Sequence, residues 1–345
     1  MRYENLNTAA TVSSFKDLRK WRQERSRKMK TKDFSYTVPC AAPDIAYLHQ
    51  NAEQPSLTWI GHSTFLIQMS GLNIVTDPVW ANQLAMQKRL TPPGIAIADM
   101  PPIDVVLISH SHYDHLHIGS LKRLTSSKTL IVPVGLASKM HRKGFSSVIE
   151  LNWWESATIG GVKFTFVPSQ HWTRRTLTDT NSSHWGGYVI EPAERAEANI
   201  ASPSSLENTG YNSRPFVNAS PTLYFAGDSG YFDGFKTIGG HFDIDVALMP
   251  IGAYDPEWFM GTQHVTPEEA LQAFMDIGAQ YFVPMHYGSF RLADDTPREA
   301  LDRLHADQAR LALDESRVVV LPHGETWRLN GGQSVPSTGP MPKSE

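Results

Sequence analysis

Short apolar runs separated by Gly, Pro and Asp begin at Ser56 and continue through most of the chain. The segment LTWIGHSTFLIQMSGLNIVTDP, residues 57–78, predicts two strands joined by a turn at Ser70-Gly71. Residues 103–110, IDVVLISH, form a nearly continuous aliphatic run, which is typical of a strand buried on both faces. These runs predict a sheet with at least one fully buried strand.

Beyond residue 110 the pattern alternates between strand-like and helix-like segments. Helical patterns cover 118–126 and 135–143, and strand-like runs cover 129–133, 147–151 and 162–167. The segments GGYVIEP and TLYFAGD predict two further strands. Between them, residues 192–221 are polar without a clear period, so we expect a poorly ordered surface insertion there.

Two helix starts share one four-residue pattern. Thr266-Pro267-Glu268-Glu269 and Thr296-Pro297-Arg298-Glu299 each place a capping Thr, a first-turn proline and a capping-box Glu in order. Paired strands followed by alternating strands and helices predict a sheet-rich α/β protein with one main domain. We expect that domain over 51–330, after an arm and lead-in over 1–50 and before a flexible tail over 331–345.

The charge is uneven, although the net charge of the chain is only −4. Residues 15–32 hold nine Lys or Arg against two acidic residues. This predicts either a solvated helical arm or an arm that binds anionic lipid. In the lipid hypothesis, Phe15, Leu18 and Trp21 form the apolar side of the arm. The acidic balance of the remaining chain argues against nucleic acid as a partner.

A single cysteine, Cys40, excludes a disulfide framework within the chain and indicates a reducing compartment. The first residues lack the apolar stretch of a signal peptide, and no run approaches the length of a membrane span. We therefore expect a cytoplasmic protein, in peripheral contact with the inner face of a membrane if residues 15–32 bind lipid. The sequence leaves the oligomeric state open, a homodimer included.

The segment LISHSHYDHLH, residues 107–117, crowds four histidines and an aspartate into eleven positions. His110 ends the buried strand, and ligand sites of α/β folds gather in the loops beyond such ends. Alternate residues of a tight turn face opposite sides, so His110 and His112 could hold one metal while Asp114 and His115 hold a second. Imidazole and carboxylate suit zinc, with iron and manganese as alternatives.

Two metals need more ligands, and later strand ends offer them. His171 follows FTFVPSQ, Asp228 follows LYFAG and His286 follows YFVPM. Each is a polar residue just past an apolar run, as His110 is, and three such residues added to the cluster make a strong signal of a metal site.

H-x-H-x-D-H followed by separated His, Asp and His resembles the metallo-β-lactamase superfamily, whose fold is an αββα sandwich with a dinuclear metal site at one edge. Within it, blocks from about residue 57 to 290 resemble the N-acyl-phosphatidylethanolamine-hydrolysing phospholipase D family. These blocks are TWIGHSTFLIQM, VTDPVW, PPIDVVLISHSHYDHL, VIELNWWE, FVPSQHWTRRTLTD, YFAGDSGY, PIGAYDPEWFMGTQHVTPEEA and MHYGSF. The 192–221 segment and the N-terminal arm depart from the family pattern.

The resemblance implies a role for each candidate ligand. One zinc ion would be bound by His110, His112 and His171, the other by Asp114, His115 and His286, with Asp228 bridging. The cations would lower the pKa of bound water toward about 7, and the resulting hydroxide would attack a phosphodiester. The family reaction releases an N-acylethanolamine and phosphatidate. Asp114 could also transfer a proton.

Further residues are predicted around these ligands. Asp77 is expected to accept a hydrogen bond from a ligating histidine, and its alternative role is an ordinary turn aspartate before proline. For His62, a place beside the ligands and a buried structural role are equally open. The resemblance supports His264, near a helix start, in holding the substrate phosphoryl group; a structural role is the alternative. Trp172, Tyr254 and Trp258 could line a groove for acyl chains, although such aromatic residues more often belong to a core.

The leading hypothesis is a dizinc phosphodiesterase of the phospholipase D type that acts on N-acylated aminophospholipids. The expected partner is accordingly a phospholipid or another small phosphodiester substrate. The same metals could instead serve a lactonase or a sugar-phosphate hydrolase of the superfamily. A third class binds metal or lipid without turnover, and the complete set of ligands argues against it.

Overall fold

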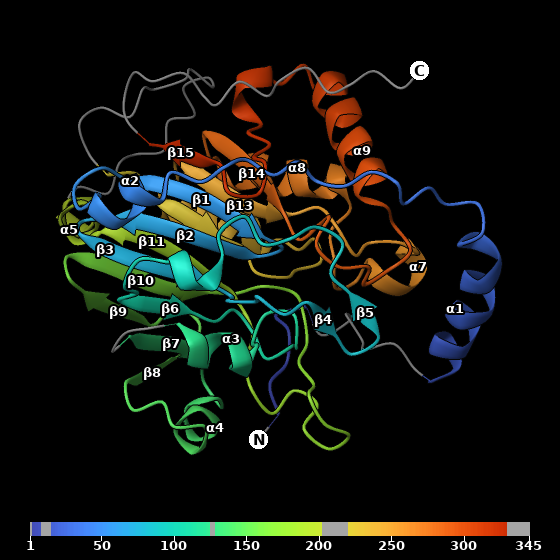
Figure 1. The fold of residues 1–345 in the computed structure, drawn as a ribbon, viewed down its shortest axis with the longest axis horizontal. Coiled ribbons are helices and arrows are strands. Elements are labelled where there is room, and N and C mark those ends of the chain that lie inside the picture. The colour runs from blue at the N-terminus through green and yellow to red at the C-terminus, as the bar shows by residue number, and fades with distance from the viewer. Residues whose placement is uncertain (1, 8–14, 125–127, 202–219, 330–345) are drawn as a thin grey trace.

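The computed structural model describes residues 2–7, 15–124, 128–201 and 220–329, in which two β-sheets stack between helices (Figure 1). The first sheet has the order β15-β1-β2-β3-β6-β7-β8 and the second the order β14-β13-β12-β11-β10-β9. The strands of the first sheet are β1 (Ser56–Gly61), β2 (Thr64–Met69), β3 (Leu72–Thr76), β6 (Val105–Leu107), β7 (Thr129–Pro133), β8 (Val148–Leu151) and β15 (Thr326–Arg328). Those of the second are β9 (Ser156–Ile159), β10 (Val162–Val167), β11 (Gly187–Pro192), β12 (Leu223–Phe225), β13 (Val246–Pro250) and β14 (Tyr281–Met285).

Helices and short elements complete the described chain. The α-helices are α1 (Phe15–Lys28), α2 (Ile45–Gln50), α3 (Ile118–Arg123), α4 (Ala137–Arg142), α5 (Ala193–Ala201), α6 (Gly234–His241), α7 (Glu257–Met260), α8 (Pro267–Ile277) and α9 (Pro297–Arg310). The strands β4 (Gln83–Leu84) and β5 (Gln87–Lys88) form a small hairpin, and 3₁₀ turns cover Ile97–Asp99 and Glu315–Arg317. No helix of the described residues is both long and apolar enough to cross a membrane.

Both faces of the first sheet are buried, and successive residues of a strand serve different faces. In β6, Val105 and Leu107 pack into the large core between the sheets, whereas Val106 packs outward with Leu121 of α3 and Met140 of α4. On the far side, α8 packs on β13, and its Phe274 packs edge-on against Phe282 of β14 on the outer face of the second sheet. The layers are therefore helix, sheet, sheet and helix, and the predicted αββα sandwich is confirmed.

Parallel pairing brings the ends of distant strands to one edge. β3, β6, β7 and β8 run parallel in the first sheet, and β12, β13 and β14 run parallel in the second. The carboxyl ends of β3, β6, β12 and β14 are followed by Asp77, the His110 loop, Asp228 and His286. The fold thus gathers these side chains, which lie far apart in the sequence.

Most predicted elements are present, with two corrections. Both helix starts have complete capping boxes, with Thr266 paired to Glu269 and Thr296 paired to Glu299. Residues 57–78 form three strands rather than two, because His62 adopts a φ of 56° and turns the chain between β1 and β2. The 192–221 segment begins with a helix, α5, where we expected irregular structure; its Ala and Glu residues favour helix. Residues 202–219 and 331–345 lie outside the described chain.

The basic arm forms helix α1, which lies beside α7 (Figure 1). The Trp21 ring stacks on Phe259 with centroids 5.0 Å apart, and Trp21 Nε1 donates to Asp294 at 2.9 Å. Arg25 also pairs with Asp294, and Lys28 pairs with Asp255. Trp21 therefore faces the body of the protein, not the free apolar side that the lipid hypothesis assigned to it.

Candidate functional site

The loop after β6 carries the dense histidine pattern, and Arg175 holds it from outside. The Arg175 guanidinium donates to the carbonyl oxygens of Ser111 (2.6 Å), His112 (3.2 Å) and Leu116 (2.8 Å). It also packs on the Tyr113 ring, 4.0 Å from the ring centroid. Because one rigid planar group binds three carbonyls, it fixes the shape of the turn and the direction of its side chains.

His110, His112 and His171 form a first cluster in which ring nitrogens face one another. His110 Nε2 lies 3.0 Å and His171 Nε2 lies 3.2 Å from His112 Nδ1. His171 Nδ1 donates to the Gln263 carbonyl at 3.0 Å. Since a carbonyl can only accept, Nε2 of the neutral His171 ring carries a lone pair.

Ser109 determines the proton position on His110. The Ser109 hydroxyl donates to Asp77 Oδ2 at 2.5 Å, so its oxygen accepts from His110 Nδ1, 2.9 Å away. Lone pairs of His110 and His171 therefore both point at His112 Nδ1, which carries one hydrogen at most. A cation among the three nitrogens would satisfy all of them, so the first cluster fits a metal ion.

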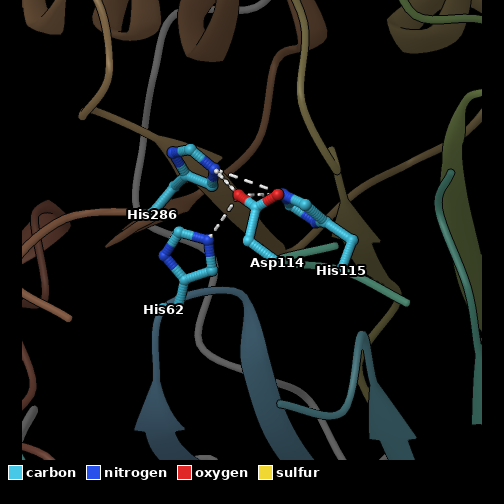
Figure 2. Close-up of side chains that lie close together, drawn as sticks. All are labelled: His62, Asp114, His115 and His286. Carbon is cyan, nitrogen blue, oxygen red and sulfur yellow. Dashed lines mark hydrogen bonds and ion pairs between the residues drawn. The ribbon is translucent and has the colours of Figure 1, made fainter. Parts of the chain in front are cut away.

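Figure 2 shows the second cluster, in which His62, His115 and His286 point toward the Asp114 carboxylate. Asp114 Oδ2 lies 3.0 Å from His62 Nε2, 3.3 Å from His115 Nε2 and 3.4 Å from His286 Nε2. His115 Nδ1 donates to Asp77 at 2.7 Å, so Nε2 is the nitrogen that faces Asp114 and His286, and it offers a lone pair to a cation once its proton has left. One carboxylate and two imidazoles directed at one point also fit a cation.

Asp228 lies between the two clusters. Its carboxylate oxygens are 3.1 Å from His115 Nε2 and 3.2 Å from His286 Nε2 in the second cluster. They are 3.8 Å from both His110 Nε2 and His171 Nε2 in the first cluster. The side chain is 2% exposed, so its charge needs these partners. A carboxylate in this position can contact a cation in either cluster.

Burial and neighbouring charges set different pKa values in the two clusters. Burial lowers the pKa of His110 well below its ordinary value and that of His112 to about 4. Burial also opposes the charging of His115 and His286, but Asp228 and the other carboxylates raise the pKa of His115 well above its ordinary value and that of His286 to about 9. Burial alone would raise the pKa of Asp228, yet His115 and His286 hold it well below its usual range. The buried carboxylates thus attract positive charge, which metal ions can supply.

Asp77 and His62 both contact the candidate ligands. Asp77 is fully buried and accepts from His115 Nδ1 and from both the N–H and the hydroxyl of Ser109. It therefore orients His115 directly and His110 through Ser109, one histidine in each cluster. Burial lowers the pKa of His62 to about 3, so its neutral ring donates from Nε2 to Asp114. Of the two roles considered for His62, the structure shows the contact with a candidate ligand.

His264 and Trp172 border the centre on its solvent side. His264 Nδ1 lies 3.9 Å from Asp228 Oδ2 and has no hydrogen-bond partner, and the side chain is 11% exposed just before the Thr266 cap. The Trp172 ring packs edge-on against His112, with centroids 4.9 Å apart. Together with the partly exposed His112 and Asp114, they form the side from which a substrate can approach.

The other two aromatic residues lie elsewhere. Tyr254 is fully buried, with the Arg303 guanidinium packed on its ring at 4.7 Å, so the prediction that it lines a groove is wrong. A side chain without exposed surface cannot contact a ligand unless the core repacks. Trp258 is 44% exposed on α7, and its ring contacts Lys20 and Glu24 of α1 rather than either cluster.

Sequence patterns missed Arg175, Ser109 and Gln263. A serine between a buried strand and the first histidine was a signal that could have revealed Ser109. Gln263 acts on His171 through its backbone carbonyl, which every residue has, so no side-chain pattern could have revealed it. Arg175 also acts on backbone atoms, and its target became visible only in the folded loop.

Comparisons with known proteins agree with this geometry. A family described as "Beta-lactamase superfamily domain" matches residues 72–287, a range that includes Asp77 and every candidate ligand from His110 to His286. The chain is 34% identical over 298 residues to N-acyl-phosphatidylethanolamine-hydrolyzing phospholipase D 1 of Caenorhabditis elegans, covering 79% of this chain and 75% of that protein. It is 27% identical over 262 residues to a UPF0173 metal-dependent hydrolase of Rubrobacter xylanophilus, covering 75% and 91%.

A solved structure shares the fold. Igni18, a metallo hydrolase from the archaeon Ignicoccus hospitalis, matches with a TM-score of 0.56 at 23% identity, over 80% of this chain and 98% of that chain. Identity at this level shows the fold alone. The family match over residues 72–287 and the 34% identity to the nematode relative show more than the fold: the chain belongs to the metallo-β-lactamase superfamily of metal-dependent hydrolases.

Proposed function

We propose that this chain is a dinuclear zinc phosphodiesterase of the phospholipase D type, which cleaves N-acyl-phosphatidylethanolamine into N-acylethanolamine and phosphatidate. The observation that carries the proposal is the position of Asp228, whose carboxylate lies within 3.8 Å of two histidine nitrogens in each cluster. The name of the nematode relative supports the choice of substrate. Nitrogen and carboxylate donors also suit iron and manganese, which are the alternative metals.

The residues of the two clusters would divide the work. One zinc ion would be held by His110, His112 and His171, the other by Asp114, His115 and His286, with Asp228 shared. Bound zinc would supply Lewis acidity, which lowers the pKa of water and neutralises charge on phosphoryl oxygens. Asp114, whose side chain is 16% exposed, faces the approach side and can accept a proton there.

His264 would bind the substrate phosphoryl group. Burial lowers its pKa to about 4, so the ring is neutral at pH 7 and keeps one N–H to donate. Its Nδ1 has no hydrogen-bond partner and lies 3.9 Å from Asp228, between the clusters. A phosphoryl oxygen at the centre would supply the missing partner.

Exposed apolar and basic side chains support a lipid substrate at a membrane surface. Tyr113 is 54% exposed in the histidine loop, and Leu177 is 93% exposed just after Arg175, which holds that loop. Helix α1 also exposes basic side chains, which are attracted to anionic headgroups. We therefore place the reaction at the cytoplasmic face of a membrane, with α1 in peripheral contact.

Charge reversal tests the proposed membrane contact. Combining Arg19→Glu, Arg22→Glu and Arg27→Glu removes exposed positive charge from α1 without touching Trp21 or Arg25, which anchor the helix. Binding to vesicles of mixed neutral and anionic lipid should weaken, and the parent should lose binding as salt rises. Equal, salt-insensitive binding of parent and variant would exclude α1 as the contact.

The central test is hydrolysis of N-acyl-phosphatidylethanolamine in mixed micelles by the zinc-loaded protein. Asp228→Asn removes the shared charge, and a lactone and a simple phosphodiester serve as competing substrates. Release of N-acylethanolamine that disappears in the variant supports the proposal. Rapid lactone opening without lipid turnover would keep the metal centre and replace the phospholipase with the lactonase.

A further inference from the structure

The chain begins with a segment that lies against the loop carrying His171. We call residues 2–7 the N-terminal strap. The Tyr3 N–H donates to the Asn181 carbonyl at 2.9 Å, and the Tyr3 ring stacks on His184 with centroids 4.6 Å apart. Arg2 donates to the Thr180 carbonyl at 3.1 Å. The strap is therefore attached along the 180–184 part of the loop, far from its own position in the sequence.

Asn5 makes the contact that reaches the centre. Its Nδ2 donates to the His171 carbonyl at 2.9 Å, and its Oδ1 accepts from the His171 N–H at 3.0 Å. Oδ1 also accepts from Trp185 Nε1 at 2.9 Å. A primary amide presents one donor and one acceptor in a plane, so it pairs with both backbone groups of one residue as a neighbouring strand does. None of the sequence patterns pointed to Asn5.

These hydrogen bonds complete the support of His171. Asn5 holds its backbone, and the Gln263 carbonyl holds Nδ1 at 3.0 Å. With the backbone and Nδ1 both held, the other ring nitrogen of His171, Nε2, is directed at His112 Nδ1 and Asp228. The His171 side chain is fully buried, so there is little room for another orientation.

We propose that Asn5 is a positioning residue of the metal centre, which fixes His171 so that the first cluster can bind its cation. The inference rests on the proposed metal function. It adds that the Asn5 amide supports the first cluster from the strap, although the strap lies outside the matched family region of 72–287. Residues that support a ligand in this way typically change metal affinity about 10- to 100-fold.

Two variants separate positioning from packing. Asn5→Ala removes the amide, and Asn5→Asp keeps its size while placing an acceptor against the His171 carbonyl. Arg2→Ala is the matched control, because it removes another side-chain contact of the strap and leaves Asn5 in place. Equivalents and affinities of bound zinc would be measured by titration against a chelating indicator, and the visible spectrum of the cobalt-substituted protein would report the ligand geometry.

We expect both Asn5 variants to bind one equivalent about 10- to 100-fold more weakly while the second equivalent keeps the parental affinity. Their cobalt spectra should change, and Arg2→Ala should match the parent in both measurements. Parental affinity and spectrum in Asn5→Asp would overturn the inference while leaving the proposed function intact. An equal loss in Arg2→Ala would also overturn it, because docking of the strap and not the amide would then be responsible. A parent protein that binds no metal would instead overturn the proposed function, and this inference with it.

Discussion

Replacing Asp77 by Asn should disturb both clusters through the hydrogen bonds that this side chain makes. Asp77 Oδ1 accepts from the Ser109 N–H at 2.8 Å, and Oδ2 accepts from the Ser109 hydroxyl at 2.5 Å and from His115 Nδ1 at 2.7 Å. An amide has only one acceptor oxygen. If its NH₂ group takes the place of Oδ2, it donates where Oδ2 accepted. His115 Nδ1 must then accept, so the proton of the neutral ring moves to Nε2. The Ser109 hydroxyl likewise donates to His110 Nδ1, and the His110 proton moves to its Nε2. In the other orientation the NH₂ group faces the Ser109 N–H, so two donors meet and this backbone hydrogen bond is lost.

Either orientation of the amide should weaken metal binding or hydrogen bonding by a similar free energy. Removing a hydrogen bond that orients a ligand weakens metal binding about 10- to 100-fold, which corresponds to about 1.4–2.7 kcal/mol. An unpaired buried donor costs about 1–3 kcal/mol. The backbone adds no further cost, because position 77 has a φ of 32°, in the positive-φ range where Asn is among the better tolerated residues.

The metal-free protein should respond less than the metal-loaded one. Burial raises the pKa of Asp77, which means that the fold disfavours its charged form. A neutral amide removes this penalty, and the gain offsets part of the lost hydrogen bonding when no cation is bound. The effect of the substitution on stability should therefore depend on metal.

Zinc titration and thermal unfolding, with zinc and with chelator, measure both consequences. Asp104→Asn is the matched control, because Asp104 Oδ2 accepts from the Asn73 N–H at 2.8 Å near the opposite end of β3 and β6. Asp77→Asn should lower the unfolding temperature mainly in zinc, whereas Asp104→Asn should shift it equally in both conditions. Parental zinc affinity in Asp77→Asn would refute the reasoning.

Three further predictions concern the loop, an acidic side chain and the metal itself. Arg175→Lys should lower the free energy of unfolding by about 1–3 kcal/mol. An ammonium lacks the rigid planar group that packs on the Tyr113 ring and holds its N–H donors in a fixed direction toward the three carbonyls. Denaturant unfolding measures this loss, and an equal loss in the exposed Arg174→Lys would contradict the reasoning. Burial raises the pKa of Asp295 from 3.8 to about 6, so the folded state holds this proton more tightly and stability falls as pH rises through that range. Asp295→Asn should flatten the fall between pH 3.8 and 6, and an unchanged slope in denaturant unfolding would exclude Asp295 as its source. Chelation should lower the unfolding temperature, because a cation present at 100 times its Kd stabilises the fold by about 2.7 kcal/mol; an unchanged temperature would argue against the metal centre.

Local properties of the chain were readable from the sequence. The capping boxes at Thr266 and Thr296 predicted the starts of α8 and α9, because a cap depends on residues three apart. The aliphatic run before His110 predicted a strand buried on both faces, and β6 is one. Errors arose where a local signal was weak: the bend at His62 divides a continuous apolar run, and α5 has no marked start.

The sequence by itself determined the candidate donor set, the loop that carries most of it and the family to which the chain belongs. Only the tertiary structure decided which nitrogens face each other, because His171, Asp228 and His286 reach the His110 loop through the order and direction of strands in two sheets. It also decided that His110, His115 and His171 each donate from Nδ1, since the acceptors of these protons are Ser109, Asp77 and the Gln263 carbonyl. Tyr254 was wrongly predicted to line a groove for the same reason, because its burial depends on how the core packs and cannot be read from the residue type.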